Sequence, residues 1–377
     1  MRAGMFLEAL APAYRIRLLV VPVFGGRTAT SDALVRRCCD SEVVVPPRAR
    51  GRWFPGITRR FDSRPELLRL FAHQARVCVD AVGAQAFDAI HAFRFYTAPL
   101  ALALADQAPR SRRPRLDLDL DDIESVTRSR LSRLYAANGR PEDAESEAAE
   151  SLRYAKAERR LLHAFDRVYV CSLHDAHQIE WHTRGDVRLA PNAVRAPDTP
   201  VSPLTTHPFT FLFVGTLSYY PNEDAVLYFC REVLPKLRAN APAPFRVRIV
   251  GTGLPPAFRF LARMEEVRLA GAVADIGKEY AEADAVIVPV RAGGGTRIKV
   301  LEAFAYRRPV VCTTLGVEGI DAQANEHFLQ ADTPGAFAAQ CLRLMQDRDL
   351  ADDLADTAYA LVTGQYSPDR IREAVAR

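Results

Sequence analysis

The clearest chemical signal in the sequence lies within residues 290–305, where glycines, cations and a carboxylate are closely spaced. An apolar run ends there and is followed, in order, by Gly293, Gly294, Gly295, Thr296, Arg297, Lys299 and Glu302. Because glycine has no Cβ, the backbone of such a loop can approach a ligand closely. The helical pattern that follows predicts an N-cap at Thr296. The free N–H groups of a helix N-terminus favour an anion, so the segment predicts a phosphate site.

The charges after the glycines strengthen this interpretation. Arg297 and Lys299 fall in the first turn of the predicted helix, where positive charge is unfavourable for the helix itself. A bound phosphate would remove that conflict. Glu302 lies one turn beyond Lys299, where a carboxylate can accept two hydrogen bonds from a ribose diol. The alternative is a flexible loop followed by a surface Lys299–Glu302 pair, worth about 0.2–0.5 kcal/mol.

Composition places the chain among ordinary globular proteins, with 377 residues, 49% of them hydrophobic and 25% charged. This length predicts two domains, or one large one. No apolar run approaches the roughly 18 residues of a membrane-spanning helix, and the run 18–24 lacks a cleavage pattern. The seven cysteines form no C-x-x-C pair, which argues against a disulfide framework or a zinc ribbon. We therefore expect a reduced, cytoplasmic protein.

The elements that must position these residues alternate between strands and helices. Strands are predicted at 17–24, 42–45, 87–91, 115–120 and 167–171, and again at 209–215, 245–251, 267–271, 285–290 and 309–313. Helices are predicted at 65–81, 223–238 and 297–306, and a long helical stretch at 125–165 contains an exposed helix–turn–helix. Strands separated by helices indicate parallel sheets with crossover helices. The fold class is therefore α/β.

A proline-rich segment divides this pattern into two domains. Prolines in the range 191–208 cannot lie inside a sheet and are typical of an extended linker: Pro191, Pro197, Pro200, Pro203 and Pro208. We predict an N-terminal domain at 1–192 and a C-terminal domain at 193–377, with the last helix, about 350–377, packing back toward the first domain. Ligands of such sheets bind at the carboxyl ends of the strands, and with two domains in the cleft.

The first domain shows two departures from an average α/β domain. Its chain enters an amphipathic helix almost at once, without the usual opening strand, and we hypothesise that the start has been cut or misassigned. Residues 1–116 also carry 19 Lys or Arg against nine Asp or Glu. Such an excess attracts an anionic partner, including the inner surface of a membrane, or is simply a solvated arginine-rich face.

Several motifs together resemble the family 4 glycosyltransferases of the GT-B fold, whose two Rossmann-like domains face each other across a cleft. The donor-site segment is matched by G-G-G-T-R-I-K-V-L-E at 293–302, R-P-V-V-C-T-T at 308–314 and G-V-E-G at 316–319. The strands of the C-terminal domain are matched by F-V-G-T-L at 213–217, with Pro221 and Asn222 after it, and I-V-G-T-G at 249–253. P-N-A-V at 191–194 resembles the boundary between domains. The resemblance covers about 190–347 well and is diffuse before that.

The resemblance implies a nucleoside-diphosphate sugar as donor, which we expect to be a UDP-sugar rather than a GDP-sugar. Glu302 would bind the ribose hydroxyls, Arg297 and Lys299 the pyrophosphate, and backbone near Val273 the base. The other expected donor contacts are Gly215, Gly251, Gly293, Gly294, Gly295 and Thr296. The family is retaining and generally requires no divalent metal, so no metal site and no tightly bound cofactor are expected.

Two positions depart from the family pattern. Many members carry a glutamate eight residues before the ribose-binding one, where this chain has Gly294, and many place basic residues where this chain has L-S-Y-Y at 217–220. These departures place more of the phosphate contact on Arg297 and Lys299. Preorganised cations of this kind stabilise the charge that develops on a departing diphosphate. The acceptor hydroxyl would attack from the leaving-group side and pass its proton to the diphosphate.

Acceptor contacts are expected in the first domain. Alternation places Asp117, Asp119 and Asp121 on one face of a strand, with Asp122 just past its end. We favour Asp121 or Asp122 as a contact to acceptor hydroxyls; a Mg²⁺ or Mn²⁺ site, a phosphatase-like nucleophile and a solvated strand end are the alternatives.

His91, predicted to end a strand, either faces the cleft and touches the donor sugar or is buried and satisfied. Arg94 beside it is a second cleft candidate. The other histidines singled out are not spaced like a metal set: His163, His174, His177 and His182.

The sequence thus predicts a glycosyltransferase that moves a sugar from a nucleoside-diphosphate sugar to an acceptor hydroxyl with retention. The acceptor would be a saccharide, a lipid-linked saccharide or a small molecule, and no nucleic-acid partner is expected. Two alternatives remain: a nucleotide-sugar epimerase on the same scaffold, and a catalytically degenerate, nucleotide-binding partner of an active transferase. The sequence does not indicate the oligomeric state.

Overall fold

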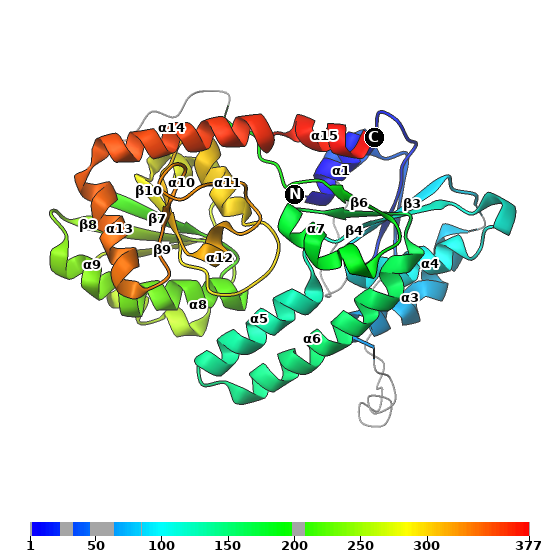
Figure 1. Ribbon diagram of the computed structural model, residues 1–377, viewed down its shortest axis with the longest axis horizontal. Coiled ribbons are helices and arrows are strands. Elements are labelled where there is room, and N and C mark those ends of the chain that lie inside the picture. Colours follow the sequence, from blue (N-terminus) through cyan, green and yellow to red (C-terminus); the bar gives the residue numbers. More distant parts are fainter. Residues whose placement is uncertain (1, 23–32, 46–63, 84, 198–207, 377) are drawn as a thin grey trace. The chain divides into compact units, whose positions relative to one another are not determined.

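The computed structural model describes residues 2–22, 33–45, 64–83, 85–197 and 208–376. The chain divides into two compact units, which are drawn in Figure 1. Unit 1 comprises Met1–Pro191 together with Asp369–Arg377, and unit 2 comprises Asn192–Pro368. Each unit is described by itself below.

Unit 1 is built on parallel strands. Its main described sheet has the order β3-β4-β5-β6, formed by β3 (Ala89–Phe93), β4 (Arg115–Asp119), β5 (Arg167–Val170) and β6 (Asp186–Leu189). A separate parallel pair joins β1 (Arg17–Val20) to β2 (Ser41–Val44). The helices of the unit are α1 (Arg2–Leu10), α2 (Ala33–Cys38), α3 (Glu66–Val82), α4 (Ala98–Ala105), α5 (Glu124–Ala137), α6 (Pro141–Leu161), α7 (Leu173–Ile179) and α15 (Pro368–Ala376). The parallel arrangement predicted from the alternating pattern is confirmed.

The central strand β4 holds unit 1 together. Four of its five residues, from Leu116 to the end of the strand, are buried, as expected for a strand covered on both faces. Leu116 and Leu118 belong to the core cluster, which also includes Val168 of β5 and Phe95 after β3. Burial of each such side chain contributes about 1.5–3 kcal/mol. The core therefore fixes the carboxyl ends of β3 and β4 side by side.

The long helical stretch of unit 1 folds back on itself. α5 and α6 form an antiparallel hairpin whose turn lies at residues 138–140 (Figure 1). Arg128 on α5 pairs with Glu147 on α6 at 3.1 Å and lies over the ring of buried Tyr154. The helix–turn–helix predicted within 125–165 is therefore present.

Unit 2 contains a parallel sheet of six described strands in the order β12-β11-β10-β7-β8-β9. The strands are β7 (Phe209–Val214), β8 (Phe245–Val250), β9 (Val267–Gly271), β10 (Ala285–Val288), β11 (Val310–Cys312) and β12 (Leu329–Gln330). The helices are α8 (Tyr220–Tyr228), α9 (Leu234–Asn240), α10 (Ile276–Glu282), α11 (Ile298–Ala305), α12 (Thr314–Val317), α13 (Pro334–Gln346) and α14 (Arg348–Gln365). Because β10 pairs with β7 in the sheet, the glycine loop after β10 lies next to the end of β7.

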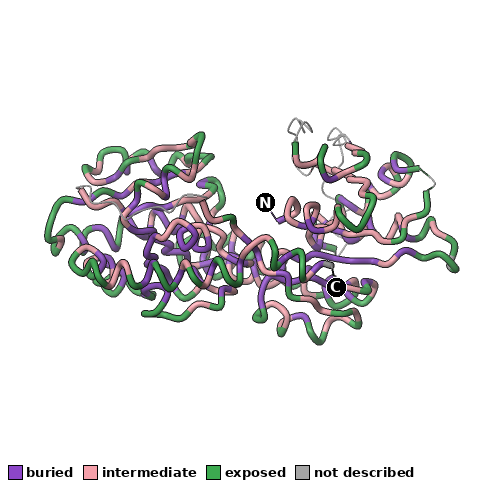
Figure 2. The backbone as a smooth tube through the Cα atoms, turned by 90° about the horizontal axis from the view of Figure 1, so that it is seen from above, coloured by how far each residue is buried: buried purple, intermediate pink, exposed green. Residues whose placement is uncertain are grey.

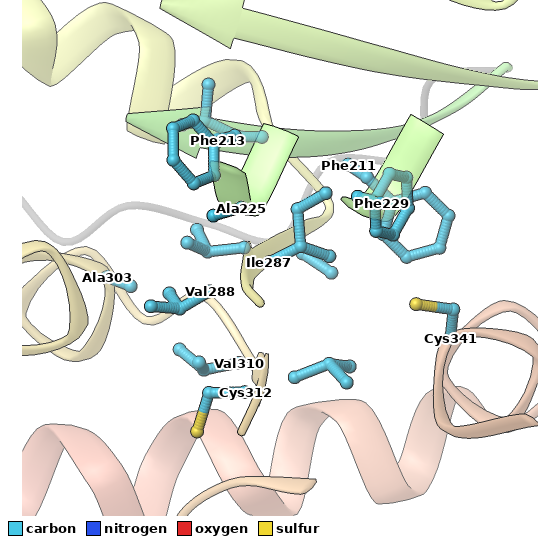
Figure 3. Packing of buried hydrophobic residues seen from close by; sticks show 14 of the residues in the cluster. Phe211, Phe213, Ala225, Phe229, Ile287, Val288, Ala303, Val310, Cys312 and Cys341 are labelled. Atoms are coloured by element: carbon cyan, nitrogen blue, oxygen red, sulfur yellow. The ribbon is translucent and has the colours of Figure 1, made fainter. Parts of the chain in front are cut away.

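The core of unit 2 lies between its sheet and its helices. Figure 3 shows Phe211, Ile287 and Val310 from three strands together with Phe229 and Cys341 from the covering helices. All five are essentially inaccessible to solvent. Figure 2 shows the same pattern over the described backbone, with buried segments inside each unit. This rigid sheet positions the loops at the carboxyl ends of β7, β8 and β10.

The structure adjusts several predicted boundaries. The strand predicted at 87–91 runs instead from Ala89 to Phe93, and the helix predicted at 223–238 is divided into α8, a π-helical segment (Phe229–Val233) and α9. β6 and β12 are strands that the sequence pattern did not indicate. The end of the strand predicted at 17–24 and the linker prolines Pro200 and Pro203 lie outside the described residues. Among the helices that the structure describes, none is long and apolar enough to span a membrane.

Candidate functional site

The carboxyl edge of the unit 2 sheet brings the predicted donor-site glycines close together. Gly215 follows β7 and donates its N–H to the Val250 carbonyl at 3.1 Å, while Gly251 follows β8 and donates to the Gly271 carbonyl at 2.8 Å. A Cβ at Gly251, whose φ is 154°, would lie 1.7 Å from the Gly215 carbonyl oxygen. Only glycine fits there, so the two strand ends approach each other more closely than side chains would allow.

The glycine loop connects β10 to α11 as predicted, but the helix begins later. α11 starts at Ile298 with Arg297 at its N-cap position, and no side chain caps it. The prediction that Thr296 is the N-cap is therefore wrong. Instead, Thr296 is buried, and its Oγ1 has no hydrogen-bond partner among the described residues. Gly293 and Gly295 have φ of 113° and 66°, a region that glycine adopts without strain. The loop thus places a buried hydroxyl beside an uncapped helix N-terminus.

Arg297 hydrogen-bonds to the glycine loop and does not lie in the first turn of the helix, where it was predicted. Its guanidinium donates to the carbonyl of Gly294 and, at 3.0 Å, to that of Gly295. Arg297 precedes the helix because Ile298 is its first residue. The guanidinium therefore lies against the glycine loop, within the same segment where an anion is predicted to bind.

Lys299 is directed toward the end of β7. Its Nζ donates to the Asn222 side-chain oxygen at 2.8 Å and lies 4.4 Å from the centre of the Phe213 ring. Burial, with a smaller contribution from nearby Arg297, lowers the pKa of Lys299 to about 7. The ammonium is thus only partly protonated near neutrality, and a bound anion would favour its charged form.

Glu302 contacts a tyrosine that the sequence analysis did not single out. Its Oε2 accepts a hydrogen bond from the Tyr280 hydroxyl at 2.8 Å, and the Tyr280 ring stacks on Tyr306 with centroids 5.3 Å apart. Burial raises the pKa of Glu302, although the Tyr280 hydrogen bond and the charge of Lys299 act in the opposite direction. In the described structure Glu302 and Lys299 form no ion pair, so the surface pair considered as the alternative is not present.

The remaining predicted donor contact is the backbone near Val273. This residue follows the end of β9 at Gly271 and is partly buried against the core of unit 2. It lies after a strand that neighbours β8 in the sheet. Its contact with a base stays a prediction.

In unit 1, Arg94 and Asp121 meet at the carboxyl edge of the sheet. Arg94 follows β3 with φ of 69°, Asp121 follows β4 with φ of 58°, and their side chains pair at 2.5 Å. Both are non-glycine residues in the left-handed region, which costs on the order of 1–3 kcal/mol each. Burial raises the pKa of Asp121 despite Arg94 nearby. Next to it, Asp122 accepts from the Thr127 hydroxyl at 3.4 Å.

The other two aspartates of this cluster are internal. The sequence pattern placed Asp121 on one face of this strand. Strand β4 ends at Asp119, however, so Asp121 lies beyond it and that prediction is wrong. Asp117 is buried and bonded to Arg115, while Asp119 is fully buried and bonded to Arg2 at 2.9 Å. Within the described ranges, no group of three or more His, Cys, Asp or Glu side chains is arranged to hold a metal ion.

His91 does not end a strand, and that prediction is wrong. It lies in the middle of β3, opposite Asp117 of β4, with its ring 4.9 Å from that of Phe6 and 5.7 Å from that of Tyr169. Its Nε2 is buried without a hydrogen-bond partner among the described residues, and burial lowers its pKa to about 4. A neutral ring packed against Phe6 of α1 agrees with the alternative that His91 is buried, but its Nε2 is not satisfied as that alternative supposed. A catalytic role for His91 stays a prediction.

Comparisons with known proteins agree with this architecture. Residues 208–347, most of unit 2 and less than half of the chain, match the family described as Glycosyl transferases group 1. Among curated proteins, none matches the sequence. The resemblance of the donor-site segment to glycosyltransferases is therefore confirmed at the level of this family.

Solved structures resemble the whole chain in fold at low identity. Sucrose-phosphate synthase from Thermosynechococcus elongatus has a TM-score of 0.69 at 16% identity, covering 100% of this chain and 90% of that one. HepE from Anabaena, in complex with UDP and glucose, has a TM-score of 0.62 at 17% identity, covering 99% and 94%. A glycosyltransferase from Rickettsia africae has a TM-score of 0.60 at 13% identity, covering 98% of this chain and 92% of that one. The predicted fold class, α/β with two Rossmann-like domains of GT-B type, is confirmed.

Proposed function

We propose that the protein transfers a sugar from a nucleoside-diphosphate sugar, with UDP as the preferred nucleotide, to an acceptor hydroxyl with retention of configuration. The observation that carries this proposal is the entry to α11, where the buried Thr296 hydroxyl, the Lys299 ammonium and the Glu302 carboxylate follow one glycine loop. The family match of this segment supports a glycosyl-transfer activity. The solved HepE structure with UDP-glucose supports the donor class.

The chemistry follows from where the charges lie. Cleavage of a glycosyl–phosphate bond builds negative charge on the departing diphosphate. Lys299 and the uncapped N-terminus of α11 would stabilise that charge as it develops, and Arg297 would exchange its loop carbonyls for phosphate oxygens. Glu302 would hold the ribose. Loss of one such donor costs typically 10²–10³ in rate, about 2.7–4 kcal/mol.

We propose that the acceptor hydroxyl attacks from the side of the leaving diphosphate and gives its proton to it. The positive charge needed at the diphosphate would then come from side chains, so turnover is expected without a divalent metal. Equal rates in the presence of EDTA and of Mg²⁺ would support this; a rate that requires the metal would contradict it.

The acceptor is proposed to bind the N-terminal domain, 1–192, and the donor to bind the C-terminal domain, 193–377. Asp121 or Asp122 would accept hydrogen bonds from acceptor hydroxyls beside Arg94, at the edge where parallel sheets bind ligands. The acceptor classes remain a saccharide, a lipid-linked saccharide and a small molecule. Peripheral contact with an anionic membrane is proposed from the basic excess in 1–116, and liposome binding that falls with added salt would support it.

A two-step experiment tests the function. A thermal-shift panel of UDP, GDP and ADP first identifies the nucleotide, because a ligand that binds only the folded protein raises its melting temperature. The matching UDP-sugars are then incubated with and without acceptor panels. Release of UDP that depends on an acceptor, with formation of a glycoside, supports a transferase. An isomerised sugar from donor alone would identify an epimerase, and nucleotide binding without any turnover a degenerate partner.

A further inference from the structure

Three elements of unit 2 converge on the side chain of Asn222. It lies in the first turn of α8, its Nδ2 donates to the Thr216 carbonyl at 3.0 Å, and its Oδ1 accepts from Lys299 Nζ at 2.8 Å. The carbonyl can only accept and the ammonium can only donate, so the two partners fix the orientation of the amide. Asn222 therefore links the loop after β7 to α11.

Gly215 makes room for this contact. A Cβ at this position would lie 2.8 Å from Asn222 Nδ2 and 2.9 Å from Lys299 Nζ. Any other residue would displace the amide or the ammonium. On its other side the ammonium lies over the ring of Phe213, 4.4 Å from its centre. The end of β7, the first turn of α8 and α11 thus surround the Lys299 ammonium closely.

We propose that Asn222 is a positioning residue of the donor site, which holds the Lys299 ammonium in its charged form and at the place where the diphosphate binds. This inference rests on the proposed function. Asn222 itself would touch no reacting atom. Its amide oxygen would act through Lys299, because a hydrogen bond accepted from an ammonium stabilises the charged over the neutral amine.

The other groups around Lys299 explain why such support matters. Arg297, which precedes α11, disfavours the charged ammonium, and Glu302, one turn along α11, favours it. The Tyr280 hydroxyl, from α10, lies 3.4 Å from the Lys299 backbone carbonyl and is bonded to Glu302. Phe213 and Asn222 are uncharged. Burial and Arg297 both lower the pKa of Lys299. The two neutral contacts that favour its charged form are the Phe213 ring and the Asn222 amide oxygen, and only the second accepts a hydrogen bond from the ammonium.

The first test measures the charge of Lys299 directly and needs no nucleotide. The chain has only four lysines, Lys156, Lys236, Lys278 and Lys299, so ¹³C labelling at the lysine ε carbon gives four NMR signals, and Lys299→Arg assigns the relevant one. The wild-type Lys299 signal should titrate with a midpoint of about 7. Asn222→Ala should lower this midpoint by about one pH unit, and Asn222→Asp should raise it.

The control and the second readout separate this role from a structural one. Asn240→Ala removes an exposed asparagine whose side chain, among the described residues, donates to the Lys236 carbonyl within α9, and it should leave the midpoint unchanged. Asn222→Ala should also weaken UDP binding about tenfold at pH 7, with Asn222→Asp retaining the Lys299 contact. The proposal is overturned if the Lys299 signal of Asn222→Ala titrates with the same midpoint as that of the wild type. If Asn222→Ala does not fold, an unchanged midpoint in Asn222→Asp overturns it instead. Absence of UDP binding by the wild type refutes the proposed function instead, and the midpoints still decide the role of Asn222.

Discussion

The hydrogen bond between Tyr280 and Glu302 leads to a prediction about ribose recognition. Tyr280→Phe removes only the hydroxyl that donates to Glu302 Oε2 at 2.8 Å, while the ring and its stacking on Tyr306 are kept. Hydrogen bonds to charged groups contribute about 1.5–3 kcal/mol. This bond is already formed without UDP, so only its effect on the orientation and charge of Glu302 toward the diol contributes to binding. We expect a loss of about 1–2 kcal/mol in UDP binding.

That loss corresponds to a roughly 5–30-fold weaker Kd, measurable by isothermal titration calorimetry. Comparing the Kd of UDP with that of 2′-deoxy-UDP makes the assay specific for the ribose, because the two nucleotides differ only in the 2′-hydroxyl. The wild type should prefer UDP, Tyr280→Phe should show a reduced preference, and Glu302→Ala should bind both alike. Tyr306→Phe is the matched control, since it removes a hydroxyl from the stacked partner ring without removing the bond to Glu302.

The pH dependence of the same complex has a definite sign. Glu302 must be ionised to accept from the diol, and burial raises its pKa, so UDP affinity should fall as pH drops through that raised value. Loss of the Tyr280 bond, which favours the carboxylate, should move this fall to higher pH. The reasoning is refuted if Tyr280→Phe keeps the wild-type Kd, the wild-type ratio between the two nucleotides and the wild-type pH profile.

Other predictions concern the charge and the packing of unit 2. UDP affinity should fall about tenfold per pH unit between pH 7 and 9, because Lys299, with a pKa of about 7, loses its proton in this range. Calorimetry should show this slope in the wild type. The Lys299→Arg variant, whose guanidinium stays charged, should show no such dependence on pH. Arg291→Met should lower the free energy of unfolding by about 2–3 kcal/mol in urea titrations, because it leaves buried Asp224 without its bidentate partner. Gly251→Ala should lower it by about 3 kcal/mol, since the new Cβ would lie 1.7 Å from a carbonyl oxygen. Gly335→Ala, in α13, meets nothing within 4 Å and should not lower it.

The parts of the site that are local in sequence were predictable. The glycine loop, the helix after it and the order of Arg297, Lys299 and Glu302 are contained in ten consecutive residues, 293–302, and their geometry follows from backbone freedom and helical spacing. The start of the helix was misplaced by assuming that Thr296 caps it, since a threonine before an apolar run is typical of an N-cap. Burial of its hydroxyl is a tertiary property.

The parts that depend on distant residues were not predictable. Asn222 meets Lys299 across 77 positions, and Tyr280 meets Glu302 across 22. In the sequence analysis Asn222 appears only within the family-like motif that follows 213–217, and that motif does not indicate a partner for a lysine. In unit 1, the pairing of Asp119 with Arg2 spans 117 positions and turns a seemingly exposed carboxylate into an internal one. Spacing along the chain contains no information about such contacts.

The most direct test of the donor site is a crystal structure of the protein soaked with UDP. The diphosphate should lie at the glycine loop and the N-terminus of α11, within about 3 Å of Lys299 Nζ and the Thr296 hydroxyl, with the ribose diol on Glu302. UDP bound elsewhere, or this position empty at a saturating concentration, would contradict the assignment of the site and the function proposed from it.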